Sequence, residues 1–198
     1  MRIFGKKRII RDVLFINGCK NKKVPHPYRY RVLHQMEQLN AGNLDCYELY
    51  YLNLNPFIVL DFHFIIIFRC PWTQTLDKTI KLAKSLNKIV LFDIDDLVID
   101  TKYTNSIPYI KTLSFYEKSL YDDNVIRMGK TLKLCEGVIT TTKILAQELK
   151  NYVQKVFINH NVASEEMFIL SQNALKIIKS IYIILIFTIN LQIKLKIN

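Results

Sequence analysis

The sequence predicts an α/β protein in which a parallel β-sheet is wrapped by helices on both faces. Short, apolar, β-branched runs alternate with helical patterns from residue 12 to residue 161. Parallel strands need such crossovers, because a tight turn cannot join them. Half of the 198 residues are hydrophobic and 23% are charged. This composition supplies enough apolar material for a core and excludes a chain that is disordered throughout.

Six segments have the length and composition of buried strands. They cover residues 12–19, 45–52, 62–69, 88–92, 137–142 and 155–161. The third of them, FHFIIIFR, is almost wholly apolar, so we expect neighbouring elements to cover it on both faces.

Four longer segments between these strands have helical spacing of their apolar residues. They cover residues 28–39, 75–87, 117–135 and 143–152. Gly129 weakens the third of these helices, because glycine has a low helix propensity. Residues 97–115 contain Pro108 and show neither periodicity, so we expect an irregular connection there.

The positive charge is concentrated at the start of the chain. The formal net charge is +11, and residues 1–40 alone carry ten basic and two acidic groups. Residues 1–11 form a basic segment without the long apolar core of a secretory signal. Because the basic excess is local and no nucleic-acid-binding motif occurs, we expect no nucleic-acid partner.

The four cysteines are widely separated, at positions 19, 46, 70 and 135, with no CxxC pair. This spacing fits neither a structural zinc site nor a small disulfide scaffold. We therefore expect reduced, buried thiols in a cytoplasmic protein.

The last residues change in character. Residues 171–198 are rich in Ile, Lys and Asn, and the stretch from Lys176 onward lacks Gly, Pro and acidic residues. A membrane-anchoring helix is one interpretation, although the apolar run is short for a span. We favour out-of-frame translation of AT-rich sequence over a native domain. Peripheral membrane contact through the basic start or this apolar tail stays open.

Polar residues follow several of the predicted strands, where ligands bind in open α/β sheets. Asn17 and Gly18 form either a tight turn or a point of close backbone approach to a phosphate or sugar. No GxGxxG or GxxxxGK[ST] motif occurs, so NAD and ATP sites are unsupported. Arg29 and Arg31, at the start of the first helix, either bind an anionic ligand or face solvent.

A carboxylate cluster follows the fourth strand, in the segment VLFDIDDLVID. Asp93, Asp95 and Asp96 are costly to crowd together unless they are paired, metal-bound or in a polar cleft. The alternatives are a Mg²⁺ or Mn²⁺ site, a structural role, and recognition of sugar hydroxyls. The segment also resembles the haloacid-dehalogenase phosphatase motif but lacks its Gly-Thr. We favour the structural role and assign no metal.

Five segments taken in order resemble the amino-terminal domain of bacterial group 1, family-four-like glycosyltransferases. The segments are YRYRVLHQMEQL, IIFR, IVLFDIDDLV, GVITTTKILAQEL and VFINHNV. The resemblance covers about residues 12–170 and implies one Rossmann-like half of a two-lobed (GT-B) enzyme. Such an enzyme transfers sugar from a nucleoside-diphosphate donor to a glycan or polysaccharide acceptor, usually without an essential metal or cofactor.

The resemblance also implies roles for particular residues. Asn17 and Gly18 would face the donor phosphates, whereas a further group would line the acceptor side of the cleft. That group comprises Arg29, Arg31, Arg69, Asp93, Asp95 and Asp96. Residues 159–163, which include Asn161, resemble the passage that leads into the second lobe.

The donor-binding lobe of that family is missing from these residues. No ExxxxxxxE pair occurs beyond residue 150, so we expect a truncated transferase with little turnover alone. A leaving diphosphate needs hydrogen-bond donors from both walls of a closed cleft. The alternatives are pairing with a separately encoded donor domain, and a non-catalytic module that binds a glycan or a protein. The catalytic residues stay unassigned.

Overall fold

The computed structural model describes residues 10–19 and 25–172. The chain divides into two compact units, residues 1–161 and 162–198. The described part of the second unit contains a helix over residues 165–172. Residues 1–9 of the predicted basic segment 1–11 and residues 173–198 of the predicted tail 171–198 lie outside the described residues.

The first unit is built on a six-stranded parallel sheet, which confirms the predicted α/β class and all six predicted strands. Every strand pair in it is parallel. The strands are β1 (Arg11–Asn17), β2 (Cys46–Tyr50), β3 (Phe62–Phe68), β4 (Ile89–Asp93), β5 (Gly137–Thr140) and β6 (Val156–Ile158).

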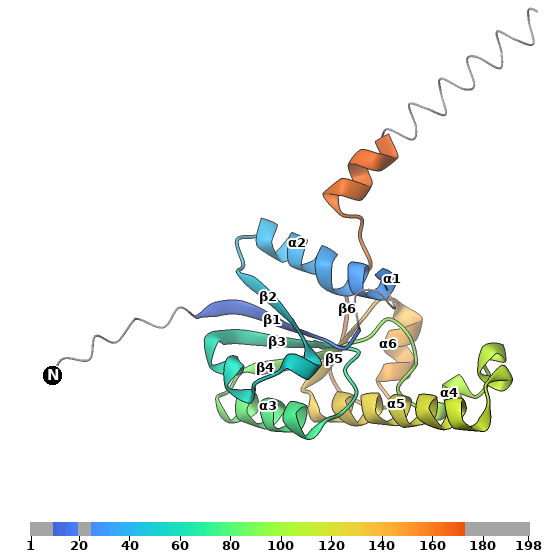
Figure 1. The fold of residues 1–198 in the computed structure, drawn as a ribbon. Helices are drawn as coiled ribbons and strands as arrows, with labels where there is room; N and C mark the ends of the chain where they lie inside the picture. The colour runs from blue at the N-terminus through green and yellow to red at the C-terminus, as the bar shows by residue number, and fades with distance from the viewer. Residues whose placement is uncertain (1–9, 20–24, 173–198) are drawn as a thin grey trace, which may run out of the picture. The chain divides into compact units, whose positions relative to one another are not determined.

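The strand order β2-β1-β3-β4-β5-β6 explains how the helices are distributed. The chain moves from β1 to β2 in one direction and then returns across β1 to add the other strands on the far side. Right-handed crossovers in opposite directions lie on opposite faces of a sheet. Figure 1 accordingly shows α2 on one side of the sheet and α3 and α5 on the other.

The predicted helices are present, with some differences at their ends. They are α3 (Gln74–Ser85), α5 (Phe115–Leu134), α6 (Lys143–Leu149), and a continuous run of α1 (Pro25–Tyr28), the π-helical turn η1 (Arg29–Leu33) and α2 (His34–Ala41). Helix α5 begins two residues before the predicted start, because Ser114 and Glu117 form a capping box.

Short helical turns also occupy segments with no predicted element. They are η2 (Tyr51–Asn53), η3 (Pro56–Asp61), α4 (Thr101–Thr104) and η4 (Pro108–Thr112). The connection 97–115 is therefore more ordered than its sequence predicts. Asp100 caps α4 by accepting a hydrogen bond from the backbone of Lys102, and a single capped turn leaves no periodic pattern in a sequence.

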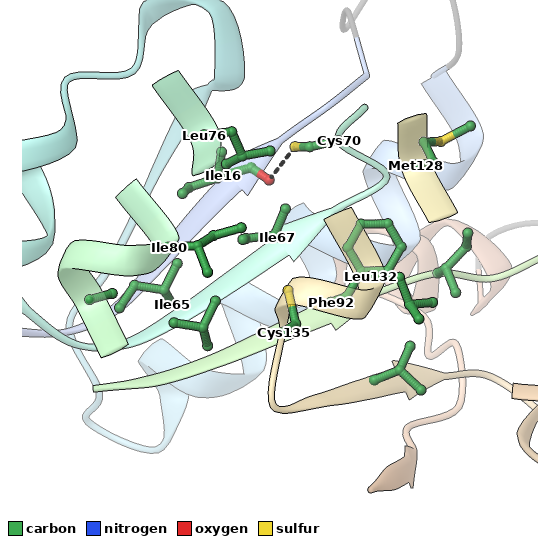
Figure 2. Close-up of a cluster of buried hydrophobic side chains, with 14 of the residues drawn as sticks. Ile16, Ile65, Ile67, Cys70, Leu76, Ile80, Phe92, Met128, Leu132 and Cys135 are labelled. Atoms are coloured by element: carbon green, nitrogen blue, oxygen red, sulfur yellow. Dashed lines mark hydrogen bonds between the residues drawn. The ribbon is translucent and has the colours of Figure 1, made fainter. Parts of the chain in front are cut away.

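The main hydrophobic core lies between the sheet and the helices α3 and α5. Figure 2 shows Ile65 and Ile67 of β3 facing Leu76 and Ile80 of α3, with Leu132 of α5 close to Phe92. The thiol of Cys70 is fully buried here and donates to the carbonyl oxygen of Ile16 at 3.3 Å. A smaller cluster on the opposite face packs under η1 and α2.

The prediction that strand 62–69 is covered on both faces is correct only for its carboxyl half. Ile65 to Phe68 are buried, whereas His63 and Phe64 are exposed. Phe64 lines an apolar groove on the face that the run α1 to α2 covers, and His63 points to the opposite face, because successive side chains of a strand alternate.

Gly129 has a packing role that outweighs its poor helix propensity. A Cβ atom at this position would lie 2.2 Å from the carbonyl oxygen of Ile99. Helix α5 therefore approaches the backbone of the β4–α4 connection at a distance that only glycine allows.

Replacing Gly129 by alanine should destabilise the first unit. The clash with Ile99 should cost about 1–3 kcal/mol, although the same change in an open helix stabilises by about 1 kcal/mol. Urea unfolding of Gly129→Ala measures the difference. Gly42→Ala is the matched control, because its Cβ would meet nothing closer than 3.3 Å. Equal stabilities of the two variants would refute the packing role.

Candidate functional site

The carboxyl ends of all six strands lie at one edge of the sheet, which gathers the predicted polar residues there. The strand order reverses between β1 and β3, and ligands of open α/β sheets bind beside such a switch point. Asn17 ends β1, Arg69 follows β3 and Asp93 ends β4. These three positions define the candidate site.

At the switch point, Asn17 is fully buried and its side-chain oxygen and nitrogen are both hydrogen-bonded to other residues of the chain. Its Oδ1 accepts from the backbone N–H of Cys19 at 2.8 Å, and its Nδ2 donates to Glu48 Oε1 at 3.1 Å. The hydroxyl of Tyr28 donates to the other oxygen of Glu48. Asn17 thus fixes the turn after β1 and ties it to β2.

Gly18 allows two backbone segments of this chain to lie unusually close together. Its N–H donates to the carbonyl oxygen of Phe68 at 2.8 Å. A Cβ atom at residue 18 would lie 2.2 Å from the carbonyl oxygen of Arg69. Of the two predicted roles for this glycine, the structure favours the tight turn, because the chain's own backbone occupies the space that the missing side chain leaves.

Arg69 forms a partly exposed charge cluster with two of the predicted carboxylates. Its Nη1 lies 3.1 Å from both Asp95 Oδ1 and Asp96 Oδ2. Arg69 has φ 48°, in the left-handed region, which costs a non-glycine residue of order 1 kcal/mol. Its N–H donates to the carbonyl oxygen of Asp93, which helps to hold this conformation.

Asp96 keeps unused hydrogen-bonding capacity in this cluster. Burial raises the pKa of its carboxyl group, although Arg69 acts in the opposite direction. Its Oδ1 is buried and accepts no hydrogen bond from the part of the chain that the structure describes. The Asp96 side chain as a whole is 43% exposed, so a ligand would contact the cluster through its exposed part and not through this buried oxygen.

Arg31 and Asp93 form a fully buried ion pair with two parallel hydrogen bonds. Arg31 Nε donates to Asp93 Oδ1 at 2.9 Å, and Nη2 donates to Oδ2 at 2.8 Å. Both side chains are 0% exposed. Burial raises the pKa of Asp93 to about 6, while Arg31 acts to lower it. Such fork-shaped contacts are the strongest that a carboxylate makes with a side chain.

The same arginine also holds the end of the first unit. Its Nη1 donates to the carbonyl oxygen of Asn159 at 2.7 Å and to Asn161 Oδ1 at 3.2 Å. The amide of Gln35, one turn further along the helix, lies beside both charged groups, where its oxygen can accept from Arg31 Nη2 at 3.0 Å. One side chain thus joins three segments that are far apart in the sequence.

The structure sorts the predicted site residues other than Asn17 and Gly18 into three sets. Arg31 and Asp93 form a buried pair whose arginine also contacts the exposed Asn161, and Arg69, Asp95 and Asp96 form a partly exposed cluster. Arg29 is exposed. Among the described residues, no group of three or more His, Cys, Asp or Glu side chains could hold a metal ion.

The geometry also tests the interpretation of VLFDIDDLVID as a phosphatase-like motif. The first aspartate of such a motif must reach a substrate, because it acts as the nucleophile. Asp93 occupies that position and is sealed against Arg31 with no exposed surface. The structure therefore favours the structural role for Asp93.

Two polar residues of this edge carried no recognisable signal in the sequence. Gln35 lies on a helix and Glu48 on a strand, and neither belongs to a motif. Gln35 does follow Arg31 by four residues, the spacing at which two side chains share a helix face. Glu48 is a lone carboxylate in an otherwise mostly apolar strand, which is the one hint of a specific partner.

No family model, curated protein or solved structure matches this chain. Among the helices that the structure describes, none combines the length and the apolar character needed to cross a bilayer.

Breaking the buried ion pair from either side should destabilise the unit strongly. Arg31→Met and Asp93→Leu should each cost about 3–5 kcal/mol, because each leaves one buried charge without its partner. The double variant should recover at least about 2 kcal/mol relative to the sum of the single losses. Urea unfolding measures all three free energies.

Arg29→Met provides the control for that cycle. Arg29 lies in the same helical turn but is exposed, so its loss should change stability by about 0.5 kcal/mol or less. Strictly additive losses for Arg31 and Asp93 would show that the two side chains do not act as a pair.

Proposed function

We propose that residues 11–161 form the acceptor-binding half of a two-lobed, nucleotide-sugar-dependent glycosyltransferase. The first support is that the resembling segments coincide with particular helices and strands of the first unit. YRYRVLHQMEQL covers η1 and α2, IVLFDIDDLV contains β4, and GVITTTKILAQEL covers β5 and α6. A Rossmann-like half of this kind has a parallel sheet with polar strand ends.

The observation that carries the proposal is the position of the boundary between the two units. The first unit ends at Asn161, within the passage 159–163 that the resemblance predicts to lead into the second lobe. Arg31 fastens the start of this passage to β4 through the carbonyl oxygen of Asn159. In a two-lobed enzyme the chain must leave the first lobe at a fixed point, because that point sets where the second lobe borders the cleft.

The proposed reaction is the attack of an acceptor hydroxyl on the anomeric carbon of the donor sugar. The new glycosidic bond forms as the bond to the diphosphate breaks, and the acceptor proton leaves to a base. On this lobe, the cluster of Arg69, Asp95 and Asp96 would hydrogen-bond acceptor hydroxyls, because it is the partly exposed group of charged side chains at this edge. Donors for the departing diphosphate would come from a second lobe, in the same polypeptide or separately encoded.

The cysteines support the cytoplasmic location that we propose along with this function. All four are free thiols. Burial is the largest of the effects that raise the pKa of the Cys19 and Cys46 thiols, and it raises the pKa of Cys46 to about 11. Such thiols stay protonated near neutral pH and react slowly.

Isothermal titration calorimetry of the chain tests the proposal. Oligosaccharides should bind measurably, whereas UDP- and GDP-sugars should bind at least about tenfold more weakly, because their phosphate contacts belong to the other lobe. Asp96→Asn should weaken oligosaccharide binding by about 1–3 kcal/mol, the usual cost of removing a charged hydrogen-bond partner.

Asp123→Asn is the control, because Asp123 is an exposed residue of α5 outside the proposed site. Preferential binding of nucleotide sugars would contradict the assignment of this lobe to the acceptor. Oligosaccharide binding that is equally strong in Asp96→Asn and Asp123→Asn would place the acceptor elsewhere.

A further inference from the structure

Two neighbouring helices, α3 and α5, each carry a row of three basic residues at three-residue spacing. We call these six residues the basic face. They are Lys78, Lys81 and Lys84 on α3, and Arg127, Lys130 and Lys133 on α5. Arg127 is partly exposed and the other five are exposed. Residues three apart project from neighbouring positions on a helix, so each row is a continuous strip of positive charge.

The two rows lie side by side on one face of the sheet. Near the ends of both helices, Lys84 Nζ donates to the carbonyl oxygen of Leu134 at 3.1 Å. At the start of α3, the N–H of Trp72 donates to the carbonyl oxygen of Arg127 at 3.0 Å, and Lys130 Nζ lies 3.3 Å from the centroid of the Trp72 ring. Helix α3 and the second half of α5 therefore form one layer (Figure 1). Each row is about 9 Å long, and packed helix axes lie about 8–10 Å apart.

Two acidic residues on the same helices offset part of this charge. Asp77 Oδ2 lies 2.7 Å from Lys81 Nζ, and the Asp77 side chain is only 18% exposed. Asp123 Oδ2 lies 3.5 Å from Arg127 Nη1. Six basic and two acidic groups leave a net charge of +4 on this surface.

The rim around the basic face is close to neutral. Toward α4, Asp100 accepts a hydrogen bond from Tyr152, and Asp122 pairs with Lys118. At the amino edge of the sheet, two basic and two acidic residues directly precede strands. They are Lys88, Lys155, Asp61 and Glu136. The positive excess therefore belongs to the basic face itself.

The opposite face of the sheet has no such excess. Residues 26–45, which cover that face, contain Arg29 and Arg31 against Glu37 and Asp45. The charge of Arg31 is moreover paired with Asp93 in the interior. A surface with charge on one side turns that side toward an oppositely charged partner as the two approach. The partner that fits the basic face is therefore anionic.

The shape of the basic face favours a lipid surface over a nucleic acid. Single strands bind where aromatic side chains stack on bases in a basic groove, whereas the ring of Trp72 is covered by Lys130. Proteins that read a duplex insert a helix or a ribbon into its groove, whereas α3 and α5 are packed side by side on the sheet through Ile80 and Leu132. Four to eight basic residues on a helical surface are typical of anionic-lipid binding.

We propose that the basic face docks this chain on the surface of an anionic lipid bilayer. The attraction is electrostatic, so the basic groups stay at the level of the headgroups and binding falls as salt rises. The proposal does not depend on the proposed glycosyl transfer. Arg69 precedes the start of α3 by a short connection, so docking would hold the cluster of Arg69, Asp95 and Asp96 beside the bilayer.

Sedimentation of the full chain with phosphatidylglycerol–phosphatidylcholine vesicles tests the proposal. The chain should co-sediment at low salt, should dissociate at high salt, and should not bind vesicles of phosphatidylcholine alone. The double variant Lys78→Glu, Lys133→Glu should bind at least about twentyfold more weakly, because each lysine near an anionic bilayer contributes about fivefold in affinity.

The double variant Arg29→Glu, Lys111→Glu is the matched control. It changes the net charge of the chain by the same amount, and both residues are exposed outside the basic face, so it should keep most of the binding. All four substituted side chains are exposed, and circular dichroism checks that both variants fold.

Three outcomes would overturn the proposal. The first is that the unaltered chain does not bind the anionic vesicles. The second is that the two double variants lose binding equally, because net charge rather than the basic face would then drive the association. The third is that the chain binds a DNA duplex and not the vesicles under the same salt conditions, which would assign the basic face to a nucleic acid.

Lysine acetylation of the unaltered chain gives an independent readout. With anionic vesicles present, acetylation of Lys78 and Lys133 should slow several-fold, whereas that of Lys111 should not change, as measured by mass spectrometry of peptides. Equal protection of all three lysines, or protection of none, would contradict docking through the basic face.

Discussion

The carboxyl edge of this sheet is organised around one buried ion pair, between Arg31 and Asp93. Arg31 comes from the π-helical turn of the first crossover, Asp93 ends a central strand, and the remaining donors of the guanidinium hold Asn159 and Asn161. Neither charged group could be left alone in this position, since an unpaired buried charge costs several kcal/mol. The first helical run, the middle of the sheet and the exit of the first unit are therefore constrained to meet.

This constraint decides which polar residues remain available for a ligand. Asn17, Arg31 and Asp93 are fully buried and satisfied by partners in the chain. The cluster of Arg69, Asp95 and Asp96 is partly exposed, most of all at the Asp96 side chain, which is 43% exposed. The edge thus combines a buried inner layer of paired side chains with a smaller exposed polar surface, which is the division expected of a site supported by its surroundings.

The periodic features of this fold could be predicted from the sequence, and the specific contacts could not. All six strands and the longer helices follow from apolar runs and helical spacing. The coverage of β3 was overestimated, because an apolar strand pattern does not reveal where along the strand the covering helices end, and His63 and Phe64 lie at its exposed start. The strand-end rule found Asp93 and Arg69, but their partners depend on distances between residues up to 130 positions apart. The sequence predicted only that Gly129 weakens its helix. Its packing role could not be predicted, because Ile99 is close to Gly129 only in the folded chain.

Side-chain NMR of Arg31 tests the central constraint most directly. A desolvated guanidinium with paired hydrogen bonds should show an Nε–H resonance that exchanges with water at least about a hundredfold more slowly than that of exposed Arg29. Asp93→Asn should abolish this protection while the backbone of β1 and β3 stays folded. An Arg31 Nε–H that exchanges as fast as that of Arg29 in the unaltered chain would show that the pair does not close the edge of the sheet.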